Sequence, residues 1–384
     1  MFCMNPISIG KNRFMKYDLI IVGAGATGLY AAIDASARGL KVCLVDEGQP
    51  GKKTSSNSTK LMHGGVRYLK SLQFKFVYEG LVERHLMLQN APDFVKPIEM
   101  ICPCRSYFDW IFNFIGLKVY QWLAGKYSLG STKLLTFKQL KEQAPHLNFE
   151  GVVGGVSFYD AKFVDEDLIT AMCETFLRLG GDFIQKKAVD IQGNRVYFLN
   201  DESIEGKGII LALGPYTDPF LEKFGFSAQL CPSRGIHIVV DKSFHPYDYA
   251  LFNMNSTDKR VFFIVPDQNK VLIGTTDVPS TSLEPTAEEI DFVIENTAIL
   301  LKKAPSHEDI LRITSGLRPL VKKQHGARDI EIVKVNDYTL SVFGGKWTSS
   351  RKTAETIVDR ICDLCHLPKR PCVTKKLKIQ KNTL

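Results

Sequence analysis

Three glycines near the start of the chain, Gly23, Gly25 and Gly28, have the G-x-G-x-x-G spacing of a dinucleotide-binding turn. The first glycine permits a tight turn, the second lets the backbone approach a pyrophosphate, and the third lets a helix pack closely on a strand. Asp46 follows at roughly the 20-residue offset at which an acid accepts hydrogen bonds from ribose hydroxyls. The spacing therefore predicts a dinucleotide site, and it leaves open whether the dinucleotide is NAD or FAD.

The elements that would position these residues lie in the same stretch. Residues 18–22 form a short apolar run typical of a buried parallel strand, residues 29–38 have a helical pattern, and residues 42–45 form a second apolar strand. A pyrophosphate would then lie at the N-terminus of the helix, where unpaired N–H groups and the helix dipole favour negative charge. The alternative is a structural βαβ unit that binds no nucleotide.

A polar stretch, residues 48–70, comes directly after Asp46 and is rich in Ser, Thr, Gly and Lys. This composition predicts a loop. Because the loop leaves the sheet on the side where a nucleotide would bind, we expect its hydroxyl and cationic side chains to line a phosphate-bearing ligand. An ordinary solvated loop is the alternative.

The rest of the chain predicts two architectures. Residues 207–213 read as another buried strand, whereas alternating segments between residues 233 and 276 predict an antiparallel sheet. We therefore expect an α/β fold, a Rossmann-like domain interleaved with a mixed, largely antiparallel β-sheet domain. The expected limits are 15–100, 150–230 and 305–365 for the first domain, 101–149 and 231–304 for the second, and flexible termini at 1–14 and 366–384.

The composition narrows the class of protein. The chain has 384 residues, 45% of them hydrophobic, and a net charge of +8, which suits an anionic substrate, an acidic membrane surface or nucleic acid. Nine cysteines and no export-type leader predict reduced thiols in the cytosol. Cys362 and Cys365 form a C-x-x-C pair, but it lies in a helical pattern without a second pair, so no metal site is expected.

An aromatic-rich segment, residues 107–123, has two interpretations. It contains Asp109, Asn113 and Lys118 and is therefore not expected to span a bilayer. One interpretation is a segment at a membrane interface, with Trp110 and Trp122 at the depth of the headgroups, and the other is a buried helix.

Four further segments carry a resemblance to a known family. They are KLMHGGVRYL at 60–69, preceded by a serine-rich run, IGTTDV at 273–278, SGLRPL at 315–320 and SVFGGKWTSSRK at 341–352. Together with the glycine turn, they make the chain resemble the FAD-dependent glycerol-3-phosphate dehydrogenases, in the larger group similar to D-amino-acid oxidase. Two features depart from that family: the helical C-terminal domain of its long members is absent, and Ser-Arg-Gly-Ile precedes His237 where a Gly-Ser is typical.

The resemblance implies FAD as the cofactor and the oxidation of sn-glycerol 3-phosphate to dihydroxyacetone phosphate, by hydride transfer from C2 to flavin N5. It places Arg67 and Lys346 near the substrate phosphate, with Tyr68 beside Arg67. It also places His237 and Arg318 at the reacting carbon, and either of them could take the proton. The expected cofactor contacts are Gly23, Ala24, Gly25, Thr27, Gly28, Asp46, Ser55, Ser56, Ser58, Lys60, His63, Val189, Gly214, Gly316, Gly345, Lys346, Trp347 and Thr348.

Other functions compete with this interpretation. An oxidase or dehydrogenase of amino acids or 2-hydroxy acids on the same fold would also need an arginine for a carboxylate. A flavin-binding tRNA modifier would use the net positive charge, but the basic residues are spread along the chain, so no nucleic acid partner is expected. A catalytically silent flavoprotein is the third alternative.

The resemblance also suggests a place for the protein in the cell. We expect a respiratory, peripheral enzyme on the cytoplasmic face of the inner membrane, with a quinone or oxygen as the electron acceptor. A homodimer is a possible assembly. The sequence does not choose between the two acceptors, or between Met1 and Met15 as the start.

Overall fold

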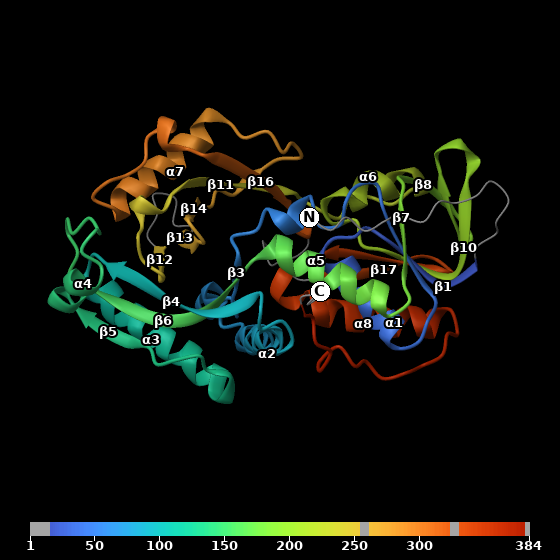
Figure 1. The fold of residues 1–384 in the computed structure, drawn as a ribbon, viewed down its shortest axis with the longest axis horizontal. Coiled ribbons are helices and arrows are strands. Elements are labelled where there is room, and N and C mark those ends of the chain that lie inside the picture. Colours follow the sequence, from blue (N-terminus) through green and yellow to red (C-terminus); the bar gives the residue numbers. More distant parts are fainter. Residues whose placement is uncertain (1–15, 254–260, 323–329, 381–384) are drawn as a thin grey trace.

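The computed structural model describes residues 16–253, 261–322 and 330–380, which form two β-sheets placed side by side along the long axis of the molecule (Figure 1). The first sheet has the strand order β17-β18-β10-β1-β2-β7, with a β8–β9 hairpin attached to β10. Its strands are β1 (Lys16–Val22), β2 (Val42–Asp46), β7 (Asp182–Gln185), β8 (Ala188–Gln192), β9 (Arg195–Phe198), β10 (Ser203–Leu211), β17 (Ile330–Asn336) and β18 (Thr339–Gly344).

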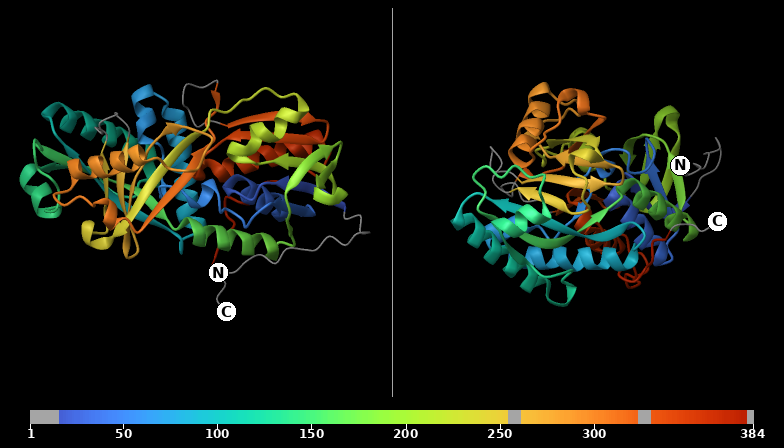
Figure 2. Two further views of the ribbon diagram at one scale, coloured as in Figure 1. Left: turned by 90° about the horizontal axis from the view of Figure 1, so that it is seen from above. Right: turned by 60° about the vertical axis from the view of Figure 1, so that its left-hand side comes forward.

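The centre of the first sheet is parallel, from β18 through β10, β1 and β2 to β7. The residues in the middle of β1 are fully buried, which explains the continuous apolar run at residues 18–22. Helices α1 (Ala26–Ala37), α5 (Asp165–Arg178) and α8 (Ser350–Leu364) cover one face, and α1 packs against both α5 and α8 (Figure 2). This arrangement confirms the predicted Rossmann-like α/β half.

The second sheet has the order β15-β11-β14-β13-β12-β4-β6-β3, with β16 paired to β11 and β5 paired to β6. Most of its pairs are antiparallel, as predicted, and only β12 and β4 run parallel among the pairs of the described residues. Its strands are β3 (Leu61–Met62), β4 (Val95–Cys104), β5 (Lys133–Thr136), β6 (Gly154–Phe163), β11 (Ser233–Asp241), β12 (Ala250–Asn253), β13 (Phe262–Asp267), β14 (Lys270–Gly274), β15 (Val278–Pro279) and β16 (Arg312–Arg318).

Helices lie on both sides of the second sheet. The helices α2 (Phe74–Asn90) and α3 (Tyr107–Ala124) pack below it in Figure 1, and α7 (Ala287–Leu300) packs above it, with α4 (Phe137–Gln143) at the outer end. A short helix, α6 (Thr217–Leu221), lies beside the first sheet. Separate apolar clusters fill the two sides of the second sheet, so each half of the molecule has its own core.

The membership of the sheets differs from the expected domain limits at four strands. Strands β3, β6 and β16 and the first part of β4, residues 95–100, belong to the second sheet, although these residues were expected in the first domain. The chain therefore crosses between the halves more often than the sequence pattern predicts, because paired strands of the second sheet come from segments far apart in the sequence.

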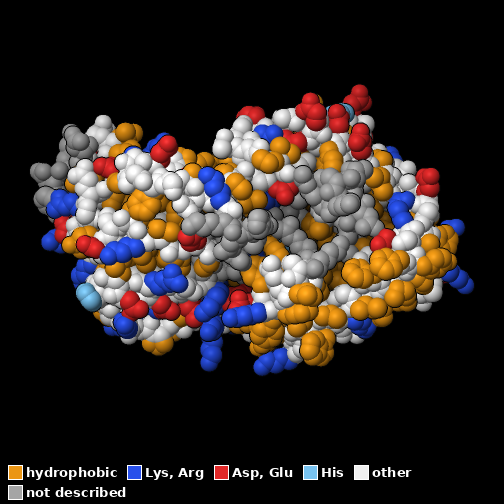
Figure 3. All heavy atoms as spheres, turned by 180° about the vertical axis from the view of Figure 1, so that it is seen from behind, with side chains coloured by type: hydrophobic (Ala, Val, Ile, Leu, Met, Phe, Trp, Pro, Cys, Tyr) orange, Lys and Arg blue, Asp and Glu red, His pale blue; other side chains and the backbone are white. Residues whose placement is uncertain are grey.

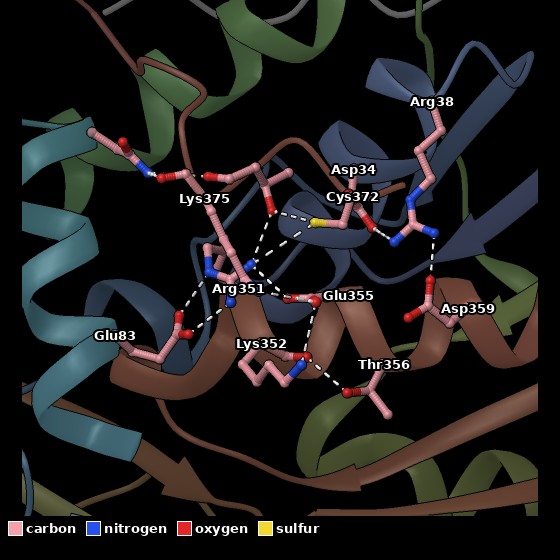
Figure 4. A network of polar contacts seen from close by, with 12 residues as sticks. Asp34, Arg38, Glu83, Arg351, Lys352, Glu355, Thr356, Asp359, Cys372 and Lys375 are labelled. Carbon is pink, nitrogen blue, oxygen red and sulfur yellow. Dashed lines mark hydrogen bonds and ion pairs between the residues drawn. The ribbon is translucent and has the colours of Figure 1, made fainter. Parts of the chain in front are cut away.

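Residues 366–380, the described part of the expected flexible C-terminus, pack against the rest of the molecule, although their basic composition suggested a solvated tail. Leu367, Thr374 and Ile379 are buried, and Asn90 of α2 donates to the carbonyl oxygens of Thr374 and Lys375. Figure 4 shows the reason. Arg351 of α8 binds several polar groups that lie around it, namely Glu83 of α2, Glu355 of α8, and Cys372 and Thr374 of the segment.

Candidate active site

The glycine turn between β1 and α1 is shaped by close backbone contacts. Gly23 has a φ of +105°, and a Cβ there would lie 2.4 Å from the Ala212 carbonyl oxygen. A Cβ on Gly28 would lie 1.8 Å from the carbonyl oxygen of Gly23. Gly25, the residue before α1, meets nothing closer than Ser55 Oγ at 3.3 Å. Gly23 and Gly28 therefore serve packing, whereas Gly25 leaves room on the open side of the turn.

The N-terminus of α1 is suited to an anion. The N-cap residue, Gly25, makes no side-chain hydrogen bond to the helix, and the first turn contains no acidic residue. The amide of Ala26 donates to Ser55 Oγ at 3.0 Å. The remaining dipole and N–H groups favour negative charge at this position, as the sequence predicts for a pyrophosphate.

Asp46 ends β2 beside this turn. One carboxylate oxygen accepts a hydrogen bond from the Ala24 amide at 2.7 Å, and the other accepts one from the Gly48 amide at 2.9 Å. Burial raises the pKa of Asp46 above its usual range, and the two amide hydrogen bonds oppose that rise. The acid is therefore fixed in place, and each oxygen keeps a lone pair for a further donor.

A cavity of about 630 Å³ opens in front of these residues. Its wall is formed by the turn after β1, the end of β2, the loop at residues 49–55, the β7–β8 connection, the segment after β10 and the end of β18. The predicted cofactor residues that line it are Gly23, Gly25, Thr27, Asp46, Ser55, Val189, Gly214, Gly345, Lys346 and Trp347. Segments far apart in the sequence thus meet around one cavity, and the types of the residues that line it fit a dinucleotide.

The remaining predicted cofactor residues are not among those that line this cavity. The Ser56 hydroxyl donates to the Gly51 carbonyl, and Ser58 and Lys60 bind the carboxylate of Asp165. Gly316 of β16 lies against Asn57. Ala24 and Gly28 belong to the turn itself, His63 follows β3 and is partly buried, and Thr348 is buried behind Trp347. Their contact with a cofactor stays a prediction.

Several lining residues were missed by the sequence reasoning. Tyr216 follows the Gly214–Pro215 pair, and the ammonium of Lys53 lies 4.1 Å from the centre of its ring. Phe220 and Lys223 of the segment around α6 also line the cavity. The sequence signal for Tyr216 is its position just after a buried strand that ends at the cavity, whereas the other residues carry no local signal.

His237 lies in β11, as the alternating pattern predicts, with Gly274 of β14 and Thr314 of β16 as its neighbours in the sheet. It is only 2% exposed, and its Nε2 lies 3.0 Å from the Thr59 hydroxyl. Burial lowers its pKa to about 3, and the positive charges of Arg318 and Lys60 contribute to the shift. The imidazole is therefore neutral at physiological pH.

Arg318 is the last residue of strand β16. Its guanidinium donates to the Thr276 carbonyl at 2.9 Å and to the Thr275 hydroxyl at 2.8 Å, and it lies 3.3 Å from the Asp277 carboxylate. It covers Gly235 of β11, where a Cβ would lie 2.1 Å from Nη2. The IGTTDV and SGLRPL segments therefore meet to orient this cation.

Neither His237 nor Arg318 is among the residues that line the cavity, but Pro319, the residue after Arg318, is one of them. The two side chains belong to neighbouring strands, since β11 pairs with β16. The structure thus places the two predicted catalytic residues on paired strands, close enough for the charge of Arg318 to lower the pKa of His237, and it places the end of β16 at the edge of the cavity.

Lys346 lines the cavity just after β18. Its ammonium lies 3.9 Å from the centre of the Phe76 ring and 5.3 Å from that of Tyr68. The indole N–H of Trp347 donates to the Ser55 carbonyl at 2.8 Å, which joins this turn to the loop after β2. Tyr68 thus lies near Lys346. Arg67 occupies the 3₁₀ turn Val66–Ser71, and its side chain lies outside the described part of the structure.

The described residues contain neither a metal-binding cluster nor a membrane-spanning helix. No group of three or more His, Cys, Asp or Glu residues in the described ranges is arranged to hold a metal ion. Within those same ranges, no helix combines the length and the apolar character needed to cross a bilayer. Cys362 and Cys365 are both free thiols near the end of α8.

Comparison with known proteins places the chain in a wider context. A family model described as "FAD dependent oxidoreductase" matches residues 18–359. A probable glycerol-3-phosphate dehydrogenase of Encephalitozoon cuniculi is 31% identical over 97% of this chain and 66% of the relative. The mitochondrial glycerol-3-phosphate dehydrogenase of Schizosaccharomyces pombe is 30% identical over 94% of this chain and 64% of the relative. The chain therefore spans slightly less than two thirds of these relatives.

A solved structure resembles the fold over most of the chain. The glycerol-3-phosphate dehydrogenase of Bacillus halodurans, complexed with FAD, superposes with a TM-score of 0.76 and 26% identity, covering 95% of this chain and 68% of the other.

Proposed function

The chain belongs to the family of FAD-dependent oxidoreductases, and we propose that it oxidises sn-glycerol 3-phosphate to dihydroxyacetone phosphate. The cofactor of this family is FAD. The residues that line the cavity in front of the glycine turn are of types that fit FAD, and we propose that FAD binds there. The names of the similar proteins support glycerol 3-phosphate as the substrate.

One observation carries the proposal for this chain. Cationic and neutral basic side chains lie where the second sheet approaches the cavity. Lys346 lines the cavity, Arg318 ends strand β16 one residue before Pro319 of the cavity wall, and His237 lies on the adjacent strand β11. A substrate with a phosphate dianion and a hydroxyl to be deprotonated needs this combination of groups.

Each residue has a proposed role. Lys346, with Arg67, would attract the phosphate, because both side chains carry a positive charge. Arg318 would stabilise negative charge on the C2 oxygen as its proton leaves. Neutral His237 is a candidate to accept that proton, and the alternative of Arg318 as the acceptor stays open. When FAD is bound, it supplies the acceptor for the C2 hydride.

The test is a visible spectrum of the purified protein before and after anaerobic addition of glycerol 3-phosphate. We expect the flavin band to bleach with glycerol 3-phosphate and not with glycerol, D-alanine or 2-hydroxyglutarate. Bleaching by an amino acid or a 2-hydroxy acid would instead support the alternative substrate class. Adding oxygen or a quinone analogue to the reduced protein would then identify the electron acceptor, for which we propose one of these two.

We also propose that α3 rests on the surface of a membrane, which would be the cytoplasmic face of the inner membrane. Its outward side is apolar, since Tyr107, Phe108 and Trp122 are 70%, 75% and 78% exposed. Figure 3 shows hydrophobic side chains gathered in a band on this face of the molecule. Trp110, by contrast, donates to the Gly155 carbonyl and packs inward, so the two expected interfacial tryptophans differ.

Co-sedimentation with anionic phospholipid vesicles tests this second proposal. Replacing Phe108 and Trp122 by Glu should lower vesicle binding at least tenfold, since each buried aromatic side chain contributes about 1.5–3 kcal/mol. Val373→Glu is a matched control, because Val373 is an exposed apolar residue in the segment after α8. Equal binding by the wild type and the double variant would exclude α3 as the contact surface.

A further inference from the structure

The hydrogen bond between His237 and Thr59 connects the candidate catalytic residue to the loop after β2. His237 Nε2 lies 3.0 Å from Thr59 Oγ1. Its other ring nitrogen, Nδ1, is buried, and no hydrogen-bond partner for it is found within the described residues. Thr59 itself is only partly buried. The hydroxyl of Thr59 therefore lies between a fully buried imidazole and the more open side of the loop.

The loop that carries Thr59 is held by a buried carboxylate. The residues on either side of Thr59 both bind Asp165, Ser58 Oγ at 3.0 Å and Lys60 Nζ at 2.6 Å. The Asp165 side chain is fully buried, and that of Lys60 is 11% exposed. The Lys60 carbonyl also accepts a hydrogen bond from the Phe163 amide. Two side-chain bonds and one backbone bond thus fix the chain on both sides of Thr59.

We infer that Thr59 is a positioning residue for His237, and that Asp165 holds Thr59 in place through Ser58 and Lys60. A neutral imidazole carries one N–H, and the partner of one ring nitrogen determines which nitrogen carries it. A threonine hydroxyl can donate or accept, so it ties Nε2 in either case and fixes the plane of the ring. Without the hydroxyl, a buried ring nitrogen would lose its partner, and the ring would be free to reorient.

This inference rests on the proposed function insofar as it takes His237 to act on the substrate, but the contact itself can be tested without substrate. The ¹⁵N resonances of the His237 ring report its tautomer and hydrogen bonding. We expect Thr59→Val to shift these resonances and to slow anaerobic flavin reduction by on the order of 10- to 100-fold, the cost of a misplaced catalytic group. Thr59→Ser, which keeps the hydroxyl, should restore both.

Two controls separate positioning from stability. Thr175→Val removes another buried threonine hydroxyl, which bonds to the Ala171 carbonyl within α5, and it should change neither measurement. Asp165→Asn should shift the His237 resonances, whereas Asp34→Asn, which alters the buried ion pair with Arg38, should not. If Thr59→Val fails to fold, the His237 resonances of Asp165→Asn test the inference instead.

The possible results distinguish this inference from the proposed function. Unchanged His237 resonances and an unchanged rate of flavin reduction in Thr59→Val and Asp165→Asn would overturn the role of Thr59. A wild-type flavin that glycerol 3-phosphate does not reduce would overturn the proposed function, and the ring resonances of the variants would still decide the contact.

Discussion

The two halves of the candidate active site are built by different means. In the first half, backbone forms much of the cavity wall: the glycine turn, the N-terminus of α1 and the Gly344–Gly345 turn after β18. In the second half, side chains from distant segments hold His237 and Arg318, namely Thr59, Thr275 and Asp277. The first half therefore depends on space for the backbone, and the second depends on pairing buried polar groups.

The largest expected effect comes from removing space in the first half. Gly28→Ala would place a Cβ about 1.8 Å from a backbone oxygen, so β1 or α1 must shift, and we expect the purified protein to lack flavin and to unfold at a lower temperature. Gly25→Ala is the matched control within the same turn, because its Cβ meets a side-chain oxygen at 3.3 Å. We expect it to stay folded and to bind FAD more weakly. Equal flavin content in the two variants would contradict the difference drawn between these glycines.

The second expected effect comes from removing a charge in the half of the molecule that contains the second sheet, outside the candidate active site. Asp160 of β6 pairs with Arg84 of α2 at 2.7 Å, both side chains are at most 5% exposed, and Tyr120 donates to the same carboxylate. Asp160→Asn would leave a buried guanidinium without a counter-charge, and we expect a loss of about 3–5 kcal/mol in the free energy of unfolding.

Denaturant unfolding followed by flavin release and by tryptophan fluorescence would measure this loss. Asp359→Asn is the control in the first half, since Asp359 is 57% exposed and its partner Arg38 keeps Asp34. We expect it to change stability by roughly 1 kcal/mol or less. A similar loss in both variants would mean that the halves do not differ in this respect.

The smallest expected effect concerns acid. Both histidines that are buried in the described part of the chain, His237 and His245, lie in the second half, and burial lowers their pKa values to about 3 and about 4. Between these values and the usual pKa of about 6.5, the unfolded chain binds more protons than the folded one. Stability should therefore fall as the pH drops through this window, by about 1.4 kcal/mol per pH unit for each histidine.

Comparing the wild type with His245→Gln from pH 4 to pH 7 measures the joint contribution of His245 and His146. His146 Nε2 lies 2.7 Å from His245 Nδ1, and burial lowers its pKa to about 3. The difference between the two proteins is used because burial raises the pKa values of Asp160 and Asp165. Those raised pKa values increase stability as the pH drops, opposite to the effect of the histidines. If His245→Gln has the same slope of stability against pH as the wild type, buried neutral histidine does not contribute to acid unfolding.

The contrast between the halves also explains what could be predicted from the sequence. The turn from Gly23 to Gly28 and Asp46 lie close together in the sequence, so their spacing alone predicts a nucleotide site. In the structure, Gly23, Gly25 and Asp46 line one cavity. The partners of the second half are far apart: Thr59 and His237 are separated by 178 residues, and Lys60 and Asp165 by 105. No local pattern indicates such pairs.

Two other differences have the same origin. SGLRPL contains the Gly and Pro typical of a turn, but pairing with β11 makes its residues up to Arg318 part of a strand. The basic composition after residue 366 suggested a solvated tail, but Asn90 and Arg351 bind that segment across the molecule. In both cases tertiary contacts override a local preference.

The most direct test of the central claim is the rate of anaerobic flavin reduction by glycerol 3-phosphate that carries deuterium at C2. If the C2 hydride moves to the flavin bound in the cavity, bleaching should be slower with the deuterated substrate than with the ordinary one. Bleaching at equal rates, when chemistry limits the observed step, would contradict hydride transfer from C2. No bleaching with either substrate would contradict the substrate itself.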